Sequence, residues 1–130
     1  MRPKKIILLV DADENDTSLL RFVIENQGRY RVVAASTTKE AKIAIWVASV
    51  DLVLCVAGKD IGEETITSVK QARPYIPMMV MVHRPETCLF IADSIISKST
   101  TPIELLERIA VMSARKRGPR KGYQRVVVAA

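Results

Sequence analysis

Carboxylates follow the first apolar run of the chain, and they are the groups best suited to chemistry here. The run IILLV is followed by Asp11, Asp13 and Glu14, with Ala12 between the first two. Carboxylate oxygens bind hard cations such as Mg²⁺, and a carboxylate can also accept a phosphoryl group. Acids at this position repel phosphate and no glycine-rich loop follows the run, so a dinucleotide-binding enzyme has little support.

Three further residues of reactive type follow later apolar runs. Asp60 comes after DLVLCVAG, His83 after MMVMV and Lys98 after SIIS. His83 is the only histidine. Without a second ligand in register it is a poor candidate for a metal site or for activating a nucleophile, whereas a pH-sensing role stays open.

The two cysteines lie in apolar sequence. Cys55 stands in CVAG and Cys88 in TCLF. Free cysteine packs as a small hydrophobic residue. We therefore predict two reduced, buried thiols and no disulfide, and two thiols alone make no zinc site.

Short apolar runs alternate with longer amphipathic stretches. Apolar or β-branched runs without a polar face are typical of strands covered on both sides. The predicted strands are Lys5 to Val10, Tyr30 to Ala35, Asp51 to Ala57, Ile76 to Val82 and Ser94 to Lys98. Their alternation with helices predicts a doubly wound α/β domain with a five-stranded parallel sheet, whose ligands bind at the carboxyl ends of the strands.

Four helices are predicted from apolar residues at helical spacing. The first has its N-cap at Asn15 or Asp16, the second follows Thr37, the third is a thin surface helix over 63 to 72, and the fourth begins at Pro102. The expected buried faces include Leu19, Leu20, Val23 and Ile24, then Ala41, Ala44, Ile45, Val47 and Ala48 with Trp46 at the edge, then Ile66, Val69 and Ala72, and finally Ile103, Leu106, Ile109 and Ala110.

The net charge of +6 is placed at one end of the sequence. The basic residues beyond 114 are Arg115, Lys116, Arg117, Arg120, Lys121 and Arg125. Without these six, 14 basic residues stand against 14 acidic ones, so residues 1 to 114 are formally neutral. Glycine and proline interrupt the basic stretch, which predicts a domain over 1 to 115 and a flexible basic tail over 116 to 130.

No apolar run approaches the roughly 20 residues that cross a bilayer. The apolar segment behind MRPKK ends at Asp11 and is too short for a secretion signal. We expect a cytoplasmic protein without membrane contact. The final VVVAA is compatible with an extra edge strand, a tether to a further domain or the boundary of a longer chain.

Four segments together resemble the receiver domain of response regulators in bacterial two-component and phosphorelay signalling. They are KKIILLVDADEND, DLVLCVAGKDIG, IPMMVMVH and ADSIISKSTTPIELLERI, and the resemblance covers residues 4 to about 115. It implies a three-layer (βα)5 domain, flavodoxin-like and CheY-like. It also implies a site with an acidic pair after strand one, a phosphoacceptor aspartate after strand three, a Ser or Thr after strand four and a Lys after strand five.

Only part of that site is retained. Asp11 and Lys98 match the first acid and the lysine, and an ion pair between them is the simplest role for both. The second acid falls on Ala12, the phosphoacceptor on Val56, the hydroxyl on Val82 and the switch aromatic on Ile95. The resemblance therefore implies a non-enzymatic pseudo-receiver without a phosphoacceptor aspartate or a metal site, whose Mg²⁺ binding is weak or absent and which needs no other cofactor.

The stretch between the fourth and fifth predicted strands is short, and Pro85 limits where a helix can begin. Helix four of the receiver pattern is therefore expected to be short or irregular. Receiver domains dock partners on the face made by helix four, strand five and helix five. The resemblance therefore implies that the candidate contact residues are Leu89, Phe90 and Ile91. The expected partner is a protein: a histidine kinase, an output domain or a second copy.

Three functions stay open. The first is phosphorylation-independent protein contact in signal transduction. The second is phosphorylation at a displaced carboxylate, either Asp13 or Asp60. A one-residue shift of the loop would also turn Asp13 inward as a metal ligand, in which case Mg²⁺ binding is weakened and not lost. The third is nucleic-acid binding, in which the basic tail contacts phosphates through Arg115, Lys116, Arg117, Arg120 and Lys121.

Overall fold

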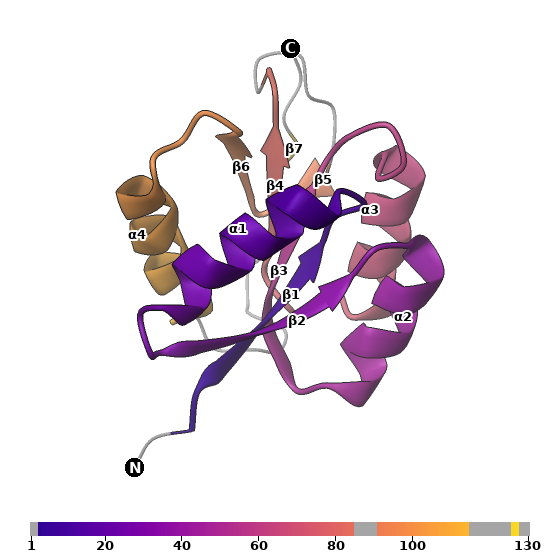
Figure 1. The fold of residues 1–130 in the computed structure, drawn as a ribbon. Helices are drawn as coiled ribbons and strands as arrows, with labels where there is room; N and C mark the ends of the chain where they lie inside the picture. The colour runs from indigo at the N-terminus through magenta and orange to yellow at the C-terminus, as the bar shows by residue number, and fades with distance from the viewer. Residues whose placement is uncertain (1–2, 85–90, 115–125, 128–130) are drawn as a thin grey trace.

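The computed structural model describes residues 3–84, 91–114 and 126–127. A five-stranded parallel sheet lies at its centre, in the order β2-β1-β3-β4-β6 (Figure 1). The strands are β1 Lys5–Val10, β2 Tyr30–Ala35, β3 Val50–Val56, β4 Met78–Val82 and β6 Ser94–Ser97. The predicted α/β class with a central five-stranded parallel sheet is confirmed.

Helices cover both faces of the sheet. Figure 1 shows α1 Glu14–Glu25 and α4 Pro102–Ser113 on one side, and α2 Thr38–Val47 and α3 Glu63–Ala72 on the other. Side chains of Thr37 and Thr101 accept hydrogen bonds from the first turns of α2 and α4, as good N-caps do. No helix within 3–84 and 91–114 is long and apolar enough to cross a membrane.

Each strand contributes to two hydrophobic cores, because successive strand residues point to opposite faces. One core lies under α2 and α3 and includes Leu8, Val53, Val80, Ile45 and Ile66. The other lies under α1 and α4 and includes Ile7, Leu54, Met79, Ile24 and Ile109. This arrangement explains why the strands are apolar at nearly every position.

Three side chains that were expected in the core are exposed. Leu19, Val47 and Ile103 have exposed fractions of 63%, 79% and 70%. At roughly 100° per residue, each lies on the far side of its helix from the residue that packs most closely on the sheet. Those packed residues are Ile24 in α1, Ile45 in α2 and Ile109 in α4.

A short antiparallel pair adds a second sheet. β5 Ile91–Ala92 pairs with β7 Val126–Val127, so part of VVVAA forms a strand outside the main sheet. Residues 85–90, where the short helix four was expected, lie outside the described residues. The flexible tail was predicted over 116–130, and the structure does not describe residues 116–125 and 128–130 of it.

A buried ion pair holds the amino end of β4. Lys70 Nζ donates to Asp93 Oδ2 at 2.7 Å and to the Ile76 carbonyl at 2.9 Å. The same Asp93 oxygen accepts the Met78 backbone N–H at 2.7 Å. The exposed fractions of the Lys70 and Asp93 side chains are 2% and 3%. This network joins α3 to the segment before β6, and it makes α3 more than the thin surface helix predicted.

Candidate functional site

The carboxyl ends of the strands surround a shallow pocket of about 590 Å³. This is the edge at which open α/β sheets bind ligands. The charged and titratable residues that line it are Asp11, Asp13, Asp16, Lys59, Asp60, His83 and Lys98. The fold therefore brings together the acids and the lysine that the sequence placed at strand ends.

Asp11 is the buried acid of this pocket, with an exposed fraction of 5%. Its Oδ1 accepts the backbone N–H of Asp13 at 3.0 Å, while its buried Oδ2 has no hydrogen-bond partner among the described residues. Burial raises the pKa of this carboxyl against the lowering effect of that hydrogen bond, and the charges of Asp16 and Asp13 raise it further. The surroundings of Asp11 therefore offset little of the free-energy cost of burying its negative charge.

Lys98 lines the same pocket but does not pair with Asp11. No salt bridge links the two side chains, both of which the structure describes. The predicted ion pair is therefore wrong, although the Lys98 charge does lower the Asp11 pKa as the smallest of several influences. The backbone N–H of Lys98 donates to the Val82 carbonyl at 2.8 Å, which ties the ends of β6 and β4 together.

Asp13 caps α1 instead of turning inward. Its Oδ1 accepts the backbone N–H groups of Asn15 at 2.9 Å and Asp16 at 3.2 Å. The N-cap is therefore Asp13, and the prediction of Asn15 or Asp16 was wrong by two or three positions. A carboxylate at a helix N-terminus is stabilised by the free backbone N–H groups of the first turn. This interaction occupies one oxygen of the residue expected as a possible metal ligand.

The strand that would carry a phosphoacceptor ends in a valine. Val56 has an exposed fraction of 3%, lines the pocket and packs in the core under α1 and α4. Asp60 also lines the pocket but is exposed in the following loop, where the Gly58 N–H donates to the Ile61 carbonyl at 2.9 Å. The nearest carboxylate after β3 is thus in a loop and not at the strand end.

The aligned positions in β4 and β6, Val82 and Ile95, carry neither a hydroxyl nor an aromatic side chain. Val82 is buried in the core under α2 and α3, and the exposed His83 lines the pocket in its place. Ile95 is half-buried, pairs with Val80 and packs against the same core. Both aligned positions are therefore filled by apolar side chains in contact with the core.

The residues of this pocket do not fit a Mg²⁺ site of the carboxylate-rich kind. Mg²⁺ requires a nearly octahedral set of oxygens and is held through carboxylates. Asp11 offers one unpartnered oxygen, while Ala12 and Val56 offer none. Among residues 3–84 and 91–114, no three or more His, Cys, Asp or Glu side chains form a group able to hold a metal ion. Weak or absent Mg²⁺ binding stays a prediction.

Solved structures similar to this fold include receiver domains. A CheY-like response regulator receiver domain protein from Methanospirillum hungatei JF-1 has a TM-score of 0.75 at 24% identity, covering 86% of this chain and 95% of that one. The non-phosphorylated HemR receiver domain from Leptospira biflexa has a TM-score of 0.74 at 23% identity, and the match covers 90% of this chain and 100% of that one. This chain has a receiver fold.

A third similar structure is the N-terminal domain of a response regulator/sensory box/GGDEF 3-domain protein from Carboxydothermus hydrogenoformans. Its TM-score is 0.70 at 21% identity, covering 85% of this chain and 94% of that one. No family model matches the chain, and no curated protein matches it. The similarity to receiver domains is therefore a similarity of fold.

The residues aligned with the receiver site in the sequence lie at the corresponding strand ends of the fold. Asp11 follows β1, Val56 ends β3, Val82 ends β4 and Lys98 follows β6, which is the fifth strand of the receiver sheet. Of the candidate partner residues, Leu89 and Phe90 lie outside the described residues, and only the backbone of Ile91 is described. The basic residues from 115 to 121 also lie outside them, so tail contacts stay predictions.

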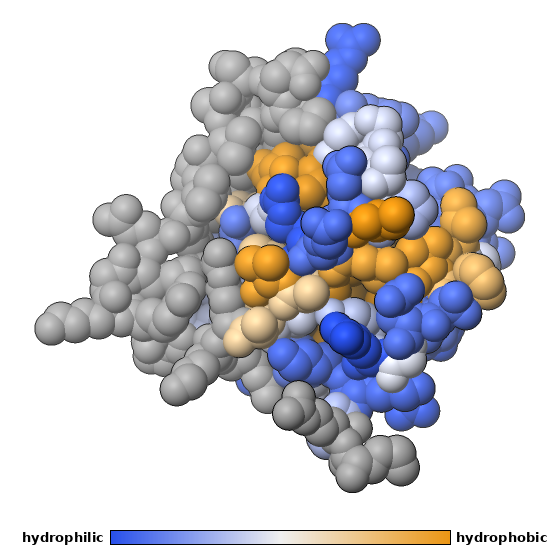
Figure 2. All heavy atoms as spheres, turned by 90° about the vertical axis from the view of Figure 1, so that its left-hand side faces the viewer, coloured by the Kyte–Doolittle hydropathy of each residue, from blue (hydrophilic) through white to orange (hydrophobic). Residues whose placement is uncertain are grey.

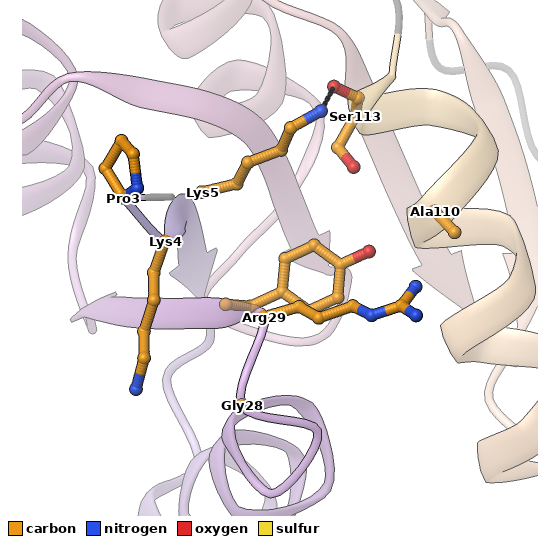
Figure 3. A pocket seen from close by; sticks show the side chains of 8 residues that line it. Pro3, Lys4, Lys5, Gly28, Arg29, Ala110 and Ser113 are labelled. Carbon is orange, nitrogen blue, oxygen red and sulfur yellow. Dashed lines mark hydrogen bonds between the residues drawn. The ribbon is translucent and has the colours of Figure 1, made fainter. Parts of the chain in front are cut away.

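A second cavity, of about 470 Å³, lies at the opposite end of the sheet (Figure 3). Lys4, Lys5 and Arg29 line it, and Figure 3 shows the Lys5 side chain reaching across to α4 while Lys4 points away. Lys5 Nζ donates to the Ser113 carbonyl at 2.7 Å. Cations stabilise the carbonyls at helix carboxyl ends, which explains why Lys5 lies here without invoking a ligand.

Cys55 has no reactive character in this fold. The free thiol is fully buried in β3, and burial raises its pKa to about 12. The thiolate is the nucleophilic form, so this cysteine is inert at neutral pH. The predicted packed thiol is confirmed for Cys55, whereas Cys88 lies outside the described residues.

Sequence reasoning missed some of the polar residues that matter in the structure. Asp16 and Lys59 line the strand-end pocket, and Lys70 forms the buried pair with Asp93. Lys70 stands four residues after Ile66, at the spacing of the buried helix face. That position was the available signal that the lysine points into the fold.

Proposed function

We propose that this chain is an atypical receiver-like domain that acts by phosphorylation-independent protein-protein contact in two-component or phosphorelay-type signal transduction. The observation that carries the proposal is Val56, which ends β3 and lines the strand-end pocket with an apolar side chain. A valine has no group that accepts a phosphoryl group. The domain then supplies a folded surface and no phosphotransfer chemistry.

The electrostatics of the pocket support the same proposal. Transfer of a phosphoryl group requires positive charge or hydrogen-bond donors placed around its oxygens. Here four aspartates line the pocket with Lys59 and Lys98. Asp11 already carries an uncompensated oxygen. A phosphoryl group would therefore enter a region with more acids than lysines, and Val82 supplies no hydroxyl to hold it.

The partner we propose is a protein: a histidine kinase, an output domain or a second copy of the chain. One of the similar structures is the N-terminal domain of a three-domain protein that includes sensory box and GGDEF parts. Attachment of the present domain to an output domain would follow that arrangement. A receiver fold that does not switch by phosphorylation can still position such a partner.

The deciding experiment is intact-mass measurement after incubation with acetyl phosphate and Mg²⁺. We expect no phosphate adduct on the wild-type chain. The matched variants are Val56→Asp with Ala12→Asp, which restores both missing carboxylates, and Val56→Asn with Ala12→Asn, which restores shape without charge. A stable phosphate on the wild-type protein would overturn the proposal.

The alternative function is phosphorylation at a displaced carboxylate. Asp60 is the better placed of the two candidates, because it is exposed at the pocket, whereas one oxygen of Asp13 caps α1. Peptide mapping of any adduct, together with Asp60→Asn and Asp13→Asn, distinguishes them. Loss of the adduct in one variant alone would identify the acceptor.

A further inference from the structure

α2 presents an apolar stripe to solvent. Ile43, Trp46 and Val47 have exposed fractions of 55%, 62% and 79%. Residues three and four apart in a helix share a face, so these three side chains form one stripe. Ala41 and Ile45 point the other way and are buried against the sheet. The stripe is therefore not needed for packing within the described fold.

The stripe lies in a shallow groove whose charged residues are all basic. Lys39 and Lys42 line the groove beside Ile43, Trp46 and Val47. At about 100° per residue these five side chains occupy one arc of the helix. The groove has a volume of about 740 Å³.

A third cation stands at the edge of the stripe. The Arg73 guanidinium lies over the Trp46 ring, 4.9 Å from its centroid. The one acid of α2 is Glu40, whose carboxylate accepts hydrogen bonds from the Ser36 backbone N–H at 2.9 Å and hydroxyl at 3.1 Å, at the amino end of the helix. Glu40 keeps its negative charge, so α2 carries two lysines against one glutamate, and Arg73 adds a further positive charge beside Trp46.

The opposite side of the molecule differs in charge pattern. Figure 2 shows apolar side chains gathered among hydrophilic ones on the side that carries α1 and α4. The exposed large apolar residues of these helices are Leu19, Phe22, Ile103 and Val111. Both helices carry acids and bases together: Asp16 and Arg21 in α1, Glu107 and Arg108 in α4. The charged residues that line the α2 groove, in contrast, are the two lysines Lys39 and Lys42.

We infer that the α2 stripe is a docking surface for an acidic amphipathic helix of a partner protein. All the residues that line this shallow groove belong to α2. A partner helix would therefore pack on it helix against helix, through apolar residues at i, i+3, i+4 and i+7. Acids flanking that face would meet Lys39, Lys42 and Arg73, and complementary charge sets orientation and selectivity. The inference rests on the proposed function in protein contact and names the surface and the partner chemistry.

Charge also argues against two other occupants. A symmetric dimer through α2 would set the same patch on both copies, placing two copies of Lys39 and of Lys42 in one interface. The chain's own segment 115–125 carries six basic residues and no acid. Like charges oppose either arrangement, whereas an acidic helix is attracted.

Trp46 makes the test direct, because it is the only tryptophan in the chain. The probe is a synthetic helical peptide of about 18 residues, long enough to form helix, with Leu on one face and Glu on the others. A second peptide carries Lys in place of every Glu. We expect the Glu peptide alone to shift Trp46 emission to shorter wavelength, saturably, and the shift to weaken as salt screens the charges.

Variants locate the contact while keeping the reporter. Lys39→Glu with Lys42→Glu should weaken binding of the Glu peptide about tenfold or more, and Ile43→Ser with Val47→Ser should weaken it by a similar factor. Leu19→Ser with Phe22→Ser on α1 is the matched control and should leave the affinity unchanged. Circular dichroism verifies that each variant folds.

Equal affinity for the Glu and Lys peptides, or no emission change at millimolar peptide, overturns the inference. So does sedimentation that shows a dimer lost in Ile43→Ser with Val47→Ser, because a second copy would then be the occupant. The outcome is independent of the phosphorylation test. An acetyl phosphate adduct with intact peptide binding removes the proposed function alone, and no adduct with no binding removes this inference alone.

Discussion

At the scale of single residues, Asp11 combines burial with an unpartnered oxygen. Its raised pKa means that the folded state binds this proton more tightly than the unfolded state does. The group therefore contributes stability below its ordinary pKa, and that contribution is lost as the pH rises through the raised value. At neutral pH the ionised Asp11 carboxylate disfavours folding.

We predict that Asp11→Asn raises the free energy of unfolding at neutral pH by about 1 kcal/mol, because it removes a buried charge and keeps an oxygen for the Asp13 N–H. The gain should disappear below the ordinary pKa of aspartate, where both proteins are neutral at this position. Urea denaturation at several pH values measures it. Asp16→Asn should give a smaller gain or none, because it removes the repulsion from an exposed neighbour and also a favourable negative charge in the first turn of α1. A destabilised Asp11→Asn protein at neutral pH would contradict this account.

The missing carboxylates set the second prediction at this scale. Val56→Asp with Ala12→Asp should raise Mg²⁺ affinity at least about tenfold over wild type, since it adds two oxygen ligands beside Asp11. Isothermal titration calorimetry measures the change, and Val56→Asn with Ala12→Asn is the uncharged control. Equal affinity in all three proteins would show that the aligned positions do not face one site.

At the scale of elements, the start of α1 depends on the Asp13 side chain. Asp13→Ala should lower the free energy of unfolding by about 1 kcal/mol, whereas Asp13→Ser should restore most of it, because serine is also a good N-cap. Thermal denaturation measures both. Rescue by serine identifies a capping role. Failure of serine to rescue, with a loss of Mg²⁺ affinity, would instead point to a ligand role for the carboxylate.

The Lys70–Asp93 pair joins α3, β4 and the segment before β6. Asp93→Ala should lower the free energy of unfolding by about 3 kcal/mol or more, because it leaves a buried ammonium without its carboxylate. Lys70→Met with Asp93→Asn should cost much less, since no buried charge is left and the amide oxygen still accepts the Met78 N–H. Urea denaturation of the variants compares these costs. Equal costs for the two proteins would rule out an uncompensated charge as the cause.

At the scale of the whole molecule, the charge is divided between a neutral body and a basic end. Residues 115–125 hold all six of the charges that make up the net +6. Any binding to single-stranded or duplex nucleic acid should therefore weaken steeply with salt and vanish when residues 115–130 are deleted. Fluorescence anisotropy at several salt concentrations tests this. Binding that survives the deletion would place the contact on the folded body.

Much of the whole-molecule architecture was predictable from the sequence, because its signals are local. Apolar runs such as MMVMV predict strands that are covered on both faces, and Thr37 and Pro102 mark helix starts through contacts within one turn. The order of strands and helices then restricts the topology, since crossovers are right-handed. The positions of Asp11, Val56 and Lys98 at one edge of the sheet follow from that topology.

Side-chain pairing needed the tertiary structure. The sequence could place Asp11 and Lys98 at the same edge, but only the folded geometry shows that they do not pair and that Asp13 is used as a cap. Lys70 and Asp93 stand 23 positions apart, so their contact depends on how α3 packs beside β4. Distances between such groups are set by long-range packing, which local periodicity does not encode.

The exposure of side chains was also predictable only in part from the sequence. Periodicity placed Ala41 and Ile45 on the inner face of α2, yet it also assigned Val47 to that face. Only the direction in which the helix packs on the sheet decides that Val47 joins Ile43 and Trp46 in solvent. The amino-acid sequence by itself determined the α/β receiver fold and the absence of a carboxylate at Val56. The tertiary structure alone decided which polar groups pair and which apolar side chains of α2 are exposed to solvent, because both depend on the relative placement of elements distant in the chain.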